Sequence, residues 1–442
     1  MSKLALFGGE KAITKTAPAE LFRWPVITQE DEEAVLEVLR RGAMSGTDVT
    51  EKFEEEFAAW NGTKYAIGYS SGTMSLQAAM YSVGLGQGDE LICQSKTYWA
   101  SCIQAFALNA TVVFADIDAD TLTIDPNDLE RCIGPKTKAI MVVHYLAHPA
   151  DMDAIMAIAK KHNLKVIEDV SHAQGGYYKG RKLGTFGDVA AMSLMSGKSF
   201  ATGEMGMLVT NNKEVYDRAM AYSHYERNNA KYVETDYLTP YYSMPLGAMK
   251  GRVNQTCAAM GRVQLKYYDQ RCHEIQKAMN YFWDLLDGCP GIKAHRPKDA
   301  GSDKAGWYAP YGLWKPDEVE GLPVERFAEA MRAEGFGVGV GGNRALHTHE
   351  YFKTFDLYHA GVPTRIQFAD RDVRELDNAL PVTESIEIYS TPWFKKFDPE
   401  YIEMYAAAYR KVAENYKELL KDAPPRKKGA NGRWFFYGSD ED

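Results

Sequence analysis

The sequence predicts an α/β protein with a mixed, mostly parallel central sheet. Seven short runs rich in apolar residues lie between residues 65 and 211, and stretches with helical spacing of apolar positions separate some of them. Several runs are nearly continuous in apolar residues, which is typical of strands covered on both faces. Strands that alternate with helices predict helices on both sides of the sheet. The predicted strands are residues 65–70, 89–94, 111–117, 138–145, 165–170, 188–195 and 206–211.

Further elements are predicted on either side of this block. A helix is expected over residues 27–42, where Thr28 is the N-cap and Asp31 completes a start like a capping box. Residues 252–287 are rich in Ala, Met, Gln, Lys and Leu, which favours one long helix. The remaining predictions are helices at residues 324–335 and 398–421 and strand-like segments at residues 307–314 and 336–342.

The length of the chain predicts two domains. Its 442 residues exceed what one hydrophobic core usually serves. Clustered Gly, Pro and Asp at residues 288–306 mark the expected boundary. We therefore expect a large domain over residues 1–287, a smaller α+β domain over residues 288–425 and a tail over residues 426–442, to which the sequence assigns no function.

Charge and composition argue against several classes of protein. The net charge of −9 at pH 7 argues against binding to nucleic acid or to an anionic membrane. No apolar run reaches the roughly 20 residues of a membrane-spanning helix, and the N-terminal apolar stretch is too short for a signal peptide. The six cysteines form no CxxC pair and no disulfide framework. We therefore expect a cytoplasmic protein with reduced thiols and no nucleic-acid or membrane partner.

A carboxylate and a lysine follow two of the predicted strands. Asp169 ends one strand and Lys198 comes shortly after another, and ligands of such sheets bind at the carboxyl ends of the strands. A buried carboxylate keeps a pyridine nitrogen protonated and a lysine amine forms a Schiff base with an aldehyde, which is what pyridoxal 5′-phosphate requires. The pair alone is a weak indication, because strand-end Asp residues are common and a single lysine is usually a solvated surface charge.

A phosphate site is predicted beside this pair. The first strand runs into SGTMSLQAAM, so Ser71, Gly72 and Thr73 lie at the start of a helix, whose free N–H groups and dipole favour an anion. Gly72 lets the backbone approach closely, and Ser193 offers a hydroxyl five residues before Lys198. For this stretch by itself, an ordinary Ser/Thr N-cap remains the simpler interpretation.

With these residues the chain resembles the sugar and cyclitol aminotransferases of the DegT/DnrJ/EryC1/StrS group, which belong to the fold-type I class of pyridoxal-phosphate enzymes. The resemblance runs from roughly residue 20 to residue 420 and implies a large sheet domain with a smaller C-terminal domain. Its ordered motifs are FRWPVITQEDEEAVLEVLRRGAMSG, YSSGTMSLQAA, FADIDADTLTIDP, PADMDAI, VIEDVSHAQGGYYKGRKLGTFGD, SGKSFATGEMGMLVT and LPVTE.

The resemblance implies a role for each residue around the cofactor ring. Lys198 matches the Schiff-base lysine and Asp169 the partner of the pyridine nitrogen. His172 matches the position that forms a hydrogen bond with the phenolic oxygen of the cofactor. Tyr98, in SKTYWAS, matches the aromatic residue that stacks on the ring, with Trp99 as the rival if the register slips by one.

The resemblance also implies the ligands of the cofactor phosphate. Gly72, Thr73 and Ser193 match those supplied within one chain. The neighbouring subunit commonly adds an N-x-R motif, which reads GAMKGRVNQ here, so Lys250 replaces the Asn and Arg252 keeps the Arg. A cation at this position still suits a phosphate dianion. The resemblance therefore implies a homodimer with shared active sites.

The implied reaction is a transamination from glutamate or glutamine to a keto-sugar or a keto-cyclitol such as scyllo-inosose. Lys198 would move a proton from the donor to the cofactor. The residues before it, MSG, are closer to the cyclitol form of the family than to the nucleotide-sugar form. Met205 in GEMG and Ala147 and His148 in HYLAH depart from the family pattern near the expected pocket and indicate an atypical acceptor.

Several alternatives stay open. A nucleotide-sugar aminotransferase would use the same residues, and a dehydratase of the family would replace the lysine by histidine, so Lys198 speaks against it. A non-catalytic binding or regulatory protein would not need lysine, aspartate and phosphate-site residues together. His144 with His148, and His347 with His349, have metal-ligand spacing, but no supporting Cys or carboxylate follows them, so no metal site is expected.

Overall fold

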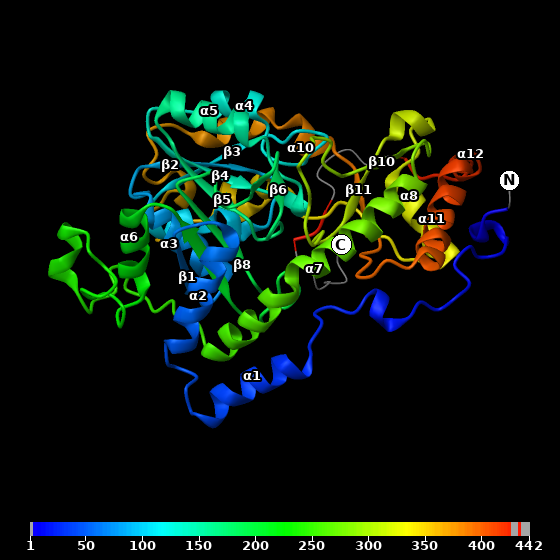
Figure 1. The fold of residues 1–442 in the computed structure, drawn as a ribbon. Helices are drawn as coiled ribbons and strands as arrows, with labels where there is room; N and C mark the ends of the chain where they lie inside the picture. The colour runs from blue at the N-terminus through cyan, green and yellow to red at the C-terminus, as the bar shows by residue number, and fades with distance from the viewer. Residues whose placement is uncertain (1–2, 426–431, 435–442) are drawn as a thin grey trace.

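The computed structural model describes residues 3–425 and 432–434, and its centre is a seven-stranded sheet (Figure 1). The strand order is β1-β9-β8-β5-β4-β2-β3. β9 runs antiparallel to both β1 and β8, and the other neighbours are parallel. All seven predicted strands and the mixed, mostly parallel sheet are confirmed. The strands are β1 Tyr65–Tyr69, β2 Glu90–Gln94, β3 Thr111–Ala115, β4 Thr137–Val143, β5 Lys165–Asp169, β8 Val189–Ser193 and β9 Gly206–Thr210.

Both faces of this sheet are buried, as the continuous apolar runs predict. In β4, Ala139, Met141 and Val143 belong to one hydrophobic core, whereas Ile140 and Val142 belong to another. Alternate side chains of a strand point to opposite faces, so each face needs its own cover. α3 Gly72–Ser82 and α6 Lys213–Ser223 pack in the first core. The second core contains residues of α2 Asp48–Asn61, α4 Pro126–Cys132 and α5 Met152–His162.

A second, smaller unit contains a three-stranded antiparallel sheet in the order β10-β11-β12. Its core holds Trp314 and Tyr389 from the strands together with apolar residues of the helices α8 and α11. The bounds are β10 Ile292–Ala294, β11 Tyr311–Trp314, β12 Ile388–Ser390, α8 Val324–Glu334, α11 Pro399–Glu414 and α12 Tyr416–Leu420. The predicted helices at residues 324–335 and 398–421 are confirmed, the latter as two consecutive helices.

The two strand-like predictions in this unit are only partly right. β11 begins at Tyr311 because Trp307 and Ala309 have positive φ angles of 52° and 46°, which interrupt an extended chain. The segment at residues 336–342 was expected as a strand and is not one; only Val340 forms an isolated bridge, to Tyr389. Glycine at every second position leaves that segment without side chains to pack against a sheet.

The long helix α7 Gln255–Leu285 connects the two units. Its first half carries Ala258 and Tyr268 into the second core, and its second half carries Met279 and Phe282 into the core of the smaller unit. The predicted long helix is confirmed. The domain division at residue 288 stays a prediction, and Leu4 of the N-terminal segment also packs with the smaller unit.

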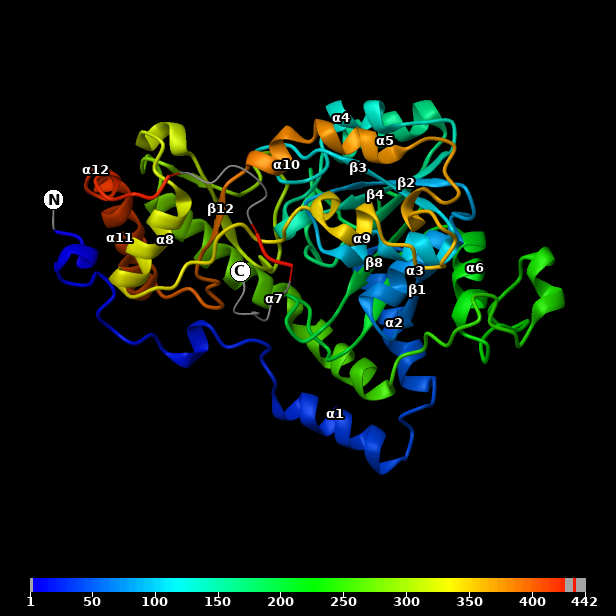
Figure 2. The same ribbon diagram turned by 180° about the vertical axis from the view of Figure 1, so that it is seen from behind.

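The segment between β11 and β12 of the smaller unit returns to the large sheet. α9 Glu350–Lys353 lies beside the seven-stranded sheet in Figure 2, and Phe352 belongs to the first core. α10 Pro381–Ser385 follows, with its backbone held by Asp116 after β3. This part of the chain thus brings residues 341–349 close to the ends of the central strands.

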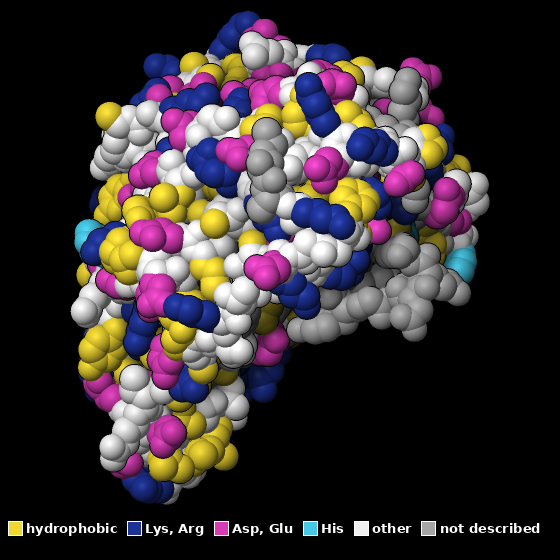
Figure 3. All heavy atoms as spheres, turned by 90° about the vertical axis from the view of Figure 1, so that its right-hand side faces the viewer, with side chains coloured by type: hydrophobic (Ala, Val, Ile, Leu, Met, Phe, Trp, Pro, Cys, Tyr) yellow, Lys and Arg dark blue, Asp and Glu magenta, His cyan; other side chains and the backbone are white. Residues whose placement is uncertain are grey.

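α1 Gln29–Arg40 begins with the predicted capping box. The Thr28 backbone N–H donates to Asp31 Oδ2 at 2.8 Å, and the Asp31 N–H donates to Thr28 Oγ1. Two short strands, β6 Tyr177–Tyr178 and β7 Arg181–Lys182, form a hairpin. Within the described residues, none of the helices is both long enough and apolar enough to span a bilayer. Basic and acidic side chains are interspersed over the face in Figure 3.

Candidate active site

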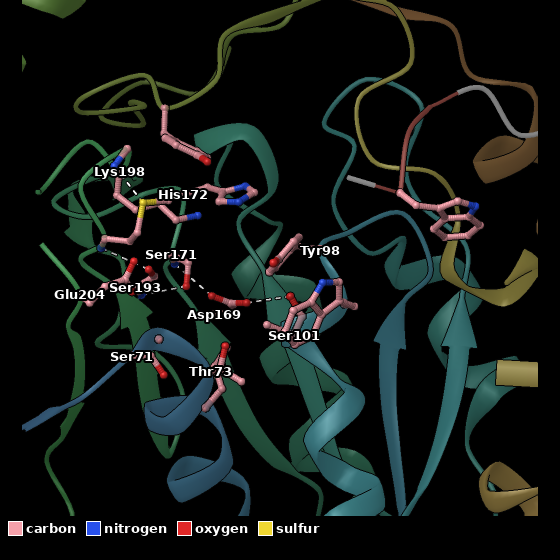
Figure 4. Close-up of a pocket in the computed structure, with 18 residues that line it drawn as sticks. Ser71, Thr73, Tyr98, Ser101, Asp169, Ser171, His172, Ser193, Lys198 and Glu204 are labelled. Atoms are coloured by element: carbon pink, nitrogen blue, oxygen red, sulfur yellow. Dashed lines mark hydrogen bonds between the residues drawn. The ribbon is translucent and has the colours of Figure 1, made fainter. Parts of the chain in front are cut away.

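A cavity of about 630 Å³ lies where β5 and β8 end and α3 begins (Figure 4). Because these strands are parallel neighbours, their carboxyl ends meet at one edge of the sheet. Of the nine predicted site residues, seven line this cavity: Gly72, Thr73, Tyr98, Asp169, His172, Ser193 and Lys198. The sequence therefore predicted where the cavity lies and most of its polar floor.

Lys198 lies in the loop after β8 and its side chain is buried, with 8 % of the residue exposed. Its backbone is fixed on both sides, because its N–H donates to Met195 O at 2.8 Å and its carbonyl accepts from Trp24 Nε1 at 2.7 Å. The amine Nζ lies 4.2 Å from the centroid of the Tyr308 ring. Burial lowers the pKa of Lys198 to about 8, although the Asp169 carboxylate opposes this shift. The amine is therefore far easier to deprotonate than an exposed lysine.

Asp169 is the last residue of β5 and its carboxylate is held by two donors. Oδ2 accepts from Ser101 Oγ at 2.8 Å and Oδ1 accepts from the Ser171 backbone N–H at 3.0 Å. Only 3 % of the residue is exposed. The two hydrogen bonds fix the carboxylate in the cavity wall.

The orientation of His172 follows from one hydrogen bond. Its Nδ1 accepts from the Leu146 backbone N–H at 3.2 Å, so the neutral ring carries its proton on Nε2. Burial lowers the pKa of His172 well below its ordinary value, and the charge of Lys198 lowers it further. The imidazole therefore stays neutral at pH 7 and offers an Nε2–H donor. Its ring lies 4.7 Å from that of Tyr308.

Tyr98 and its neighbour Trp99 both line the cavity. Their ring centroids lie 4.8 Å apart with an interplanar angle of 38°. Burial raises the pKa of Tyr98, so the phenol stays protonated at pH 7. Both aromatic residues thus remain candidates for the residue that stacks on a planar ligand.

The start of α3, where an anion site is predicted, lies at the cavity. The Ser71 side chain accepts from the Met74 backbone N–H at 3.1 Å, which caps the helix. A Cβ at Gly72 would lie 2.5 Å from Ser193 Cβ, so only glycine lets the first turn approach β8 this closely. The N–H groups of a first helical turn have no partners within the helix and attract anions. Thr73 and Ser193 add hydroxyl groups at the same end of the cavity.

Lys250 and Arg252 do not line the cavity of their own chain. They lie between α6 and α7 and flank Gly251, whose carbonyl accepts from the Ser70 backbone N–H at 2.8 Å directly after β1. Lys250 is exposed, and Arg252 Nη1 lies 3.3 Å from Glu226 Oε1. The family-derived expectation that these two cations act on a neighbouring subunit stays a prediction.

Several lining residues were not predicted. Ser101 and Ser171 lie one helical turn after Tyr98 and two residues after Asp169, and this proximity was a signal that could have identified them. Tyr308 follows a loop with positive φ angles, and Trp434 lies in the tail, so no periodic pattern marks either residue. Glu204 also lines the cavity, directly before Met205 of the GEMG motif.

The departures from the family pattern lie behind the cavity wall. Met205 is fully buried, and its Cε lies 2.9 Å from where a Cβ at Gly68 would be. Ala147 is also buried, and the His148 ring stacks on that of His295 at 5.0 Å. The expectation that these residues lie near the pocket holds only in this indirect sense, since none of them lines it.

The four histidines with metal-ligand spacing have other neighbours. His144 Nε2 lies 3.2 Å from Glu168 Oε2, and His347 Nδ1 lies 2.7 Å from Ser95 Oγ. The His349 side chain accepts from the Tyr351 N–H at 3.0 Å. Across residues 3–425 and 432–434, no group of three or more Cys, His, Asp or Glu side chains is arranged to hold a metal ion.

This fold, with a buried lysine amine, a fixed carboxylate and a helix N-terminus around one cavity, defines the fold-type I class of pyridoxal-phosphate enzymes. Residues 25–374 match the DegT/DnrJ/EryC1/StrS aminotransferase family, and the chain belongs to it. The protein is thus a pyridoxal-phosphate-dependent aminotransferase of the sugar and cyclitol type.

Individual relatives and solved structures agree with this assignment. The chain is 31 % identical over 394 residues to the L-glutamine:2-deoxy-scyllo-inosose aminotransferase of Streptoalloteichus tenebrarius, covering 85 % of this chain and 90 % of that protein. It is 38 % identical over 246 residues to GDP-perosamine synthase of Escherichia coli, covering 55 % of this chain and 65 % of that protein. The X-ray structure of the aminotransferase from Psychrobacter cryohalolentis superimposes with a TM-score of 0.74 at 27 % identity, covering 90 % of this chain and all of that one.

Proposed function

We propose that the protein transfers an amino group from glutamate or glutamine to a ketone on a free cyclitol resembling scyllo-inosose. The observation that supports a transamination is the position of Lys198 and Asp169 on the wall of one buried cavity that also includes a helix N-terminus. A cyclitol acceptor is favoured by the MSG sequence before Lys198 and by the similarity to an inosose aminotransferase over 85 % of the chain.

The residues of the cavity fit the cofactor. Gly72, Thr73 and Ser193 would hold its phosphate, and the close approach that Gly72 permits leaves the first-turn N–H groups open to it. Asp169 would pair with the ring nitrogen. When bound, pyridoxal phosphate supplies an aldehyde for amine exchange and a ring that accepts electrons from the substrate carbon.

The remaining side chains around the ring have matching chemistry. Tyr98 would lie on the face of the ring, and the His172 Nε2–H would donate to the phenolic oxygen. That donor role requires a neutral imidazole with its proton on Nε2, which is the state that burial and the Leu146 hydrogen bond favour. The fixed tautomer therefore supports the assignment of His172.

Lys198 performs the proton transfers in this proposal. Its amine has a pKa of about 8, so about a tenth of it is neutral at pH 7 and can accept the proton of the donor Cα. The same Nζ then delivers a proton to the cofactor carbon C4′. Asp169, held by Ser101 and Ser171, keeps the ring nitrogen protonated while this happens. Burial of both groups keeps bulk water away from the transferred proton.

We further propose a homodimer in which Lys250 and Arg252 complete the phosphate site of the partner subunit. The segment before them exposes Tyr237, Tyr241 and Met244, with 49 %, 53 % and 63 % of each residue accessible. Exposed apolar residues grouped on one projecting segment are typical of an interface. The six cysteines are all unpaired, which supports the cytoplasm as the compartment.

Subunit complementation tests the dimer. Lys198→Ala and Arg252→Gln should each be nearly inactive alone, but a mixed dimer contains one intact site, so an equal mixture refolded or co-expressed should regain about a quarter of wild-type activity. The matched control is a mixture of Lys198→Ala with Asp169→Asn, whose mixed dimers hold no intact site. An active monomer, or a mixture without recovery, contradicts the shared site.

The acceptor is tested with the aminated holoenzyme. After reaction with L-glutamine, scyllo-inosose and other keto-cyclitols should restore the absorption of the aldehyde form of the cofactor, whereas nucleotide-linked keto-sugars should not. Lys198→Ala is the control for absorption changes that need no proton transfer. Restoration by a nucleotide-linked keto-sugar alone would replace the first proposal by a second one, which the 38 % identity to GDP-perosamine synthase supports.

A further inference from the structure

Three residues of the tail return to the active site. The Arg433 backbone N–H donates to Gly342 O at 2.9 Å, and the Arg344 N–H donates to Arg433 O at 3.2 Å, so residues 342–344 and 432–434 pair as short parallel segments. Gly432 has a φ of 129°, and a Cβ there would lie 2.8 Å from backbone atoms of the paired segment. Glycine at this position is therefore required for the close approach. In the sequence GRW at residues 432–434, the glycine therefore allows the backbone to pair with residues 342–344.

Trp434 forms part of the wall of the main cavity. Its indole ring lies edge-on to the His349 ring at a centroid distance of 4.5 Å and an angle of 86°. The Arg344 guanidinium carbon lies 5.4 Å from the indole centroid. Two neighbours from the same loop thus hold the side chain at the cavity.

Arg433 lines a second cavity of about 200 Å³, which shares His172 and Tyr308 with the main one. The other polar groups there include Tyr311 and Tyr145, whose hydroxyl donates to Asn343 Oδ1 at 2.9 Å. The two cavities therefore meet at the residues that face Lys198. A substrate bound beside Lys198 can extend a short arm toward Arg433.

The main cavity contains carboxylates, whereas the described lining of the second cavity contains an arginine without one. Among the described residues that line the two cavities, the lysine and arginine side chains are Lys198 and Arg433, and the carboxylates are those of Asp169 and Glu204. Lys198 is assigned to the cofactor. None of the described residues that line the second cavity with Arg433 carries a carboxylate, and Arg433 is exposed, so its charge is available to an entering ligand. A guanidinium is well suited to hold a planar carboxylate through two hydrogen bonds.

We propose that Arg433 binds the α-carboxylate of the amino donor and that Trp434 closes the cavity beside it. This inference rests on the proposed transamination, because an amino-acid donor brings a carboxylate that must be placed while its amine meets Lys198. The tail would then set the orientation of the donor, and so present its Cα proton to Nζ. Arg433 is here a binding residue of the first half-reaction. The cyclitol acceptor of the second half-reaction is uncharged and needs no cation to bind it.

Single half-reactions of full-length holoenzyme test the proposal. The conversion of the cofactor by L-glutamine is followed by absorption, and its half-saturating concentration is compared with that for L-glutaminol, which has CH₂OH in place of the α-carboxylate. In Arg433→Gln, that concentration for L-glutamine should rise about 10-fold to 100-fold, with the limiting rate nearly unchanged, while L-glutaminol should react as with wild type. Arg433→Lys should recover part of the loss. Arg332→Gln, an exposed arginine of α8, is the matched control.

The outcomes separate this inference from the function on which it rests. An unchanged L-glutamine response in Arg433→Gln overturns it, and so does an equal loss with L-glutaminol, which would indicate a purely structural role. A loss confined to the acceptor half-reaction also overturns it. If wild type accepts L-glutamine but aminates no keto-sugar or keto-cyclitol, the proposed function fails while the Arg433 result remains interpretable. Trp434→Ala should weaken L-glutamine and L-glutaminol alike, by about 3-fold to 10-fold, and Trp434→Phe by less.

Discussion

The main cavity has two walls that are built differently. The first, here called the strand wall, consists of Gly72, Asp169 and Ser193 at the ends of regular elements and of Lys198 in the loop that follows β8. The second, here called the loop wall, consists of Tyr308 and Trp434, which come from irregular segments. On the strand wall, Asp169 has two internal hydrogen bonds and Gly72 packs directly against Ser193.

The difference between the walls matches a division of labour. A cofactor whose reactive atom must meet Lys198 needs positions fixed by the sheet, whereas substrates of different shapes need a surface that tolerates change. Tyr308 lies between two residues with positive φ, Trp307 and Ala309, so its place depends on the conformation of one loop. We therefore expect substitutions on the strand wall to abolish chemistry and those on the loop wall to alter substrate choice.

The largest effect is expected for Lys198→Ala. Lys198 is the one lysine among the described residues that line the main cavity. Loss of its amine should reduce turnover by at least about 10⁴-fold, and borohydride should no longer attach the cofactor to this position. The measurements are steady-state turnover and peptide mass mapping after reduction. Lys160→Ala, on the exposed face of α5, is the control and should behave as wild type. A label on another residue in wild type would contradict the assignment of Lys198 as the residue that binds the cofactor.

A smaller but still large loss is expected for Asp169→Asn. The amide keeps the shape of the side chain but cannot hold a ring nitrogen in its protonated state, so kcat should fall about 10²-fold to 10³-fold. Ser101→Ala removes one of the two hydrogen bonds to this carboxylate and should cost about 3-fold to 10-fold. Thermal unfolding of each variant distinguishes loss of chemistry from loss of fold. Equal effects of the two substitutions would contradict the central role of the carboxylate.

The pH dependence of cofactor uptake sharpens the account of Lys198. Burial lowers the pKa of its amine to about 8, and only the neutral amine attacks an aldehyde, so the uptake rate of cofactor-free protein should rise with pH up to about 8 and then level off. The rise should be about 10-fold per pH unit below that point. Stopped-flow absorption between pH 6 and pH 9.5 measures it. A rate that still rises steeply at pH 9.5 would mean that the lysine has an ordinary pKa.

The smallest effect is expected on the loop wall. Tyr308→Leu should change the half-saturating concentration of the acceptor by about 3-fold to 10-fold and leave uptake of the cofactor nearly unchanged. Separate measurements of acceptor saturation and cofactor affinity test this split. Tyr311→Leu, whose side chain lines only the second cavity, is the matched control for loss of one aromatic group. A collapse of cofactor affinity in Tyr308→Leu would abolish the distinction between the two walls.

The two walls also differ in how far sequence reasoning reaches. Asp169 and Ser193 end strands whose apolar runs are continuous, and Gly72 follows such a run, so periodicity places them at the same edge of the sheet. Tyr308 and Trp434 reach the cavity through turns and through contacts between segments far apart in sequence, which no local pattern encodes. The glycine-rich segment at residues 336–342 illustrates the same limit, because it reads as a strand but serves as the loop leading to Asn343 and Arg344.

The resemblance to a family identified site residues that periodicity could not identify, but it did not identify all of them. It identified Tyr98 and His172, which the structure places on the cavity wall. It also assigned Lys250 and Arg252 to a neighbouring subunit, and a single chain holds both outside its own cavity. It gave no indication of Arg433, because the resemblance ends at roughly residue 420.

The shared helix α7 has a mechanical consequence. Its 31 residues extend about 46 Å at 1.5 Å per residue, and its opposite ends are embedded in two different cores. A continuous helix that packs in the cores of both units resists rotation of one unit against the other. We therefore expect any opening that admits a substrate to come from the loops around Tyr308 and Asn343 rather than from rotation of one unit against the other.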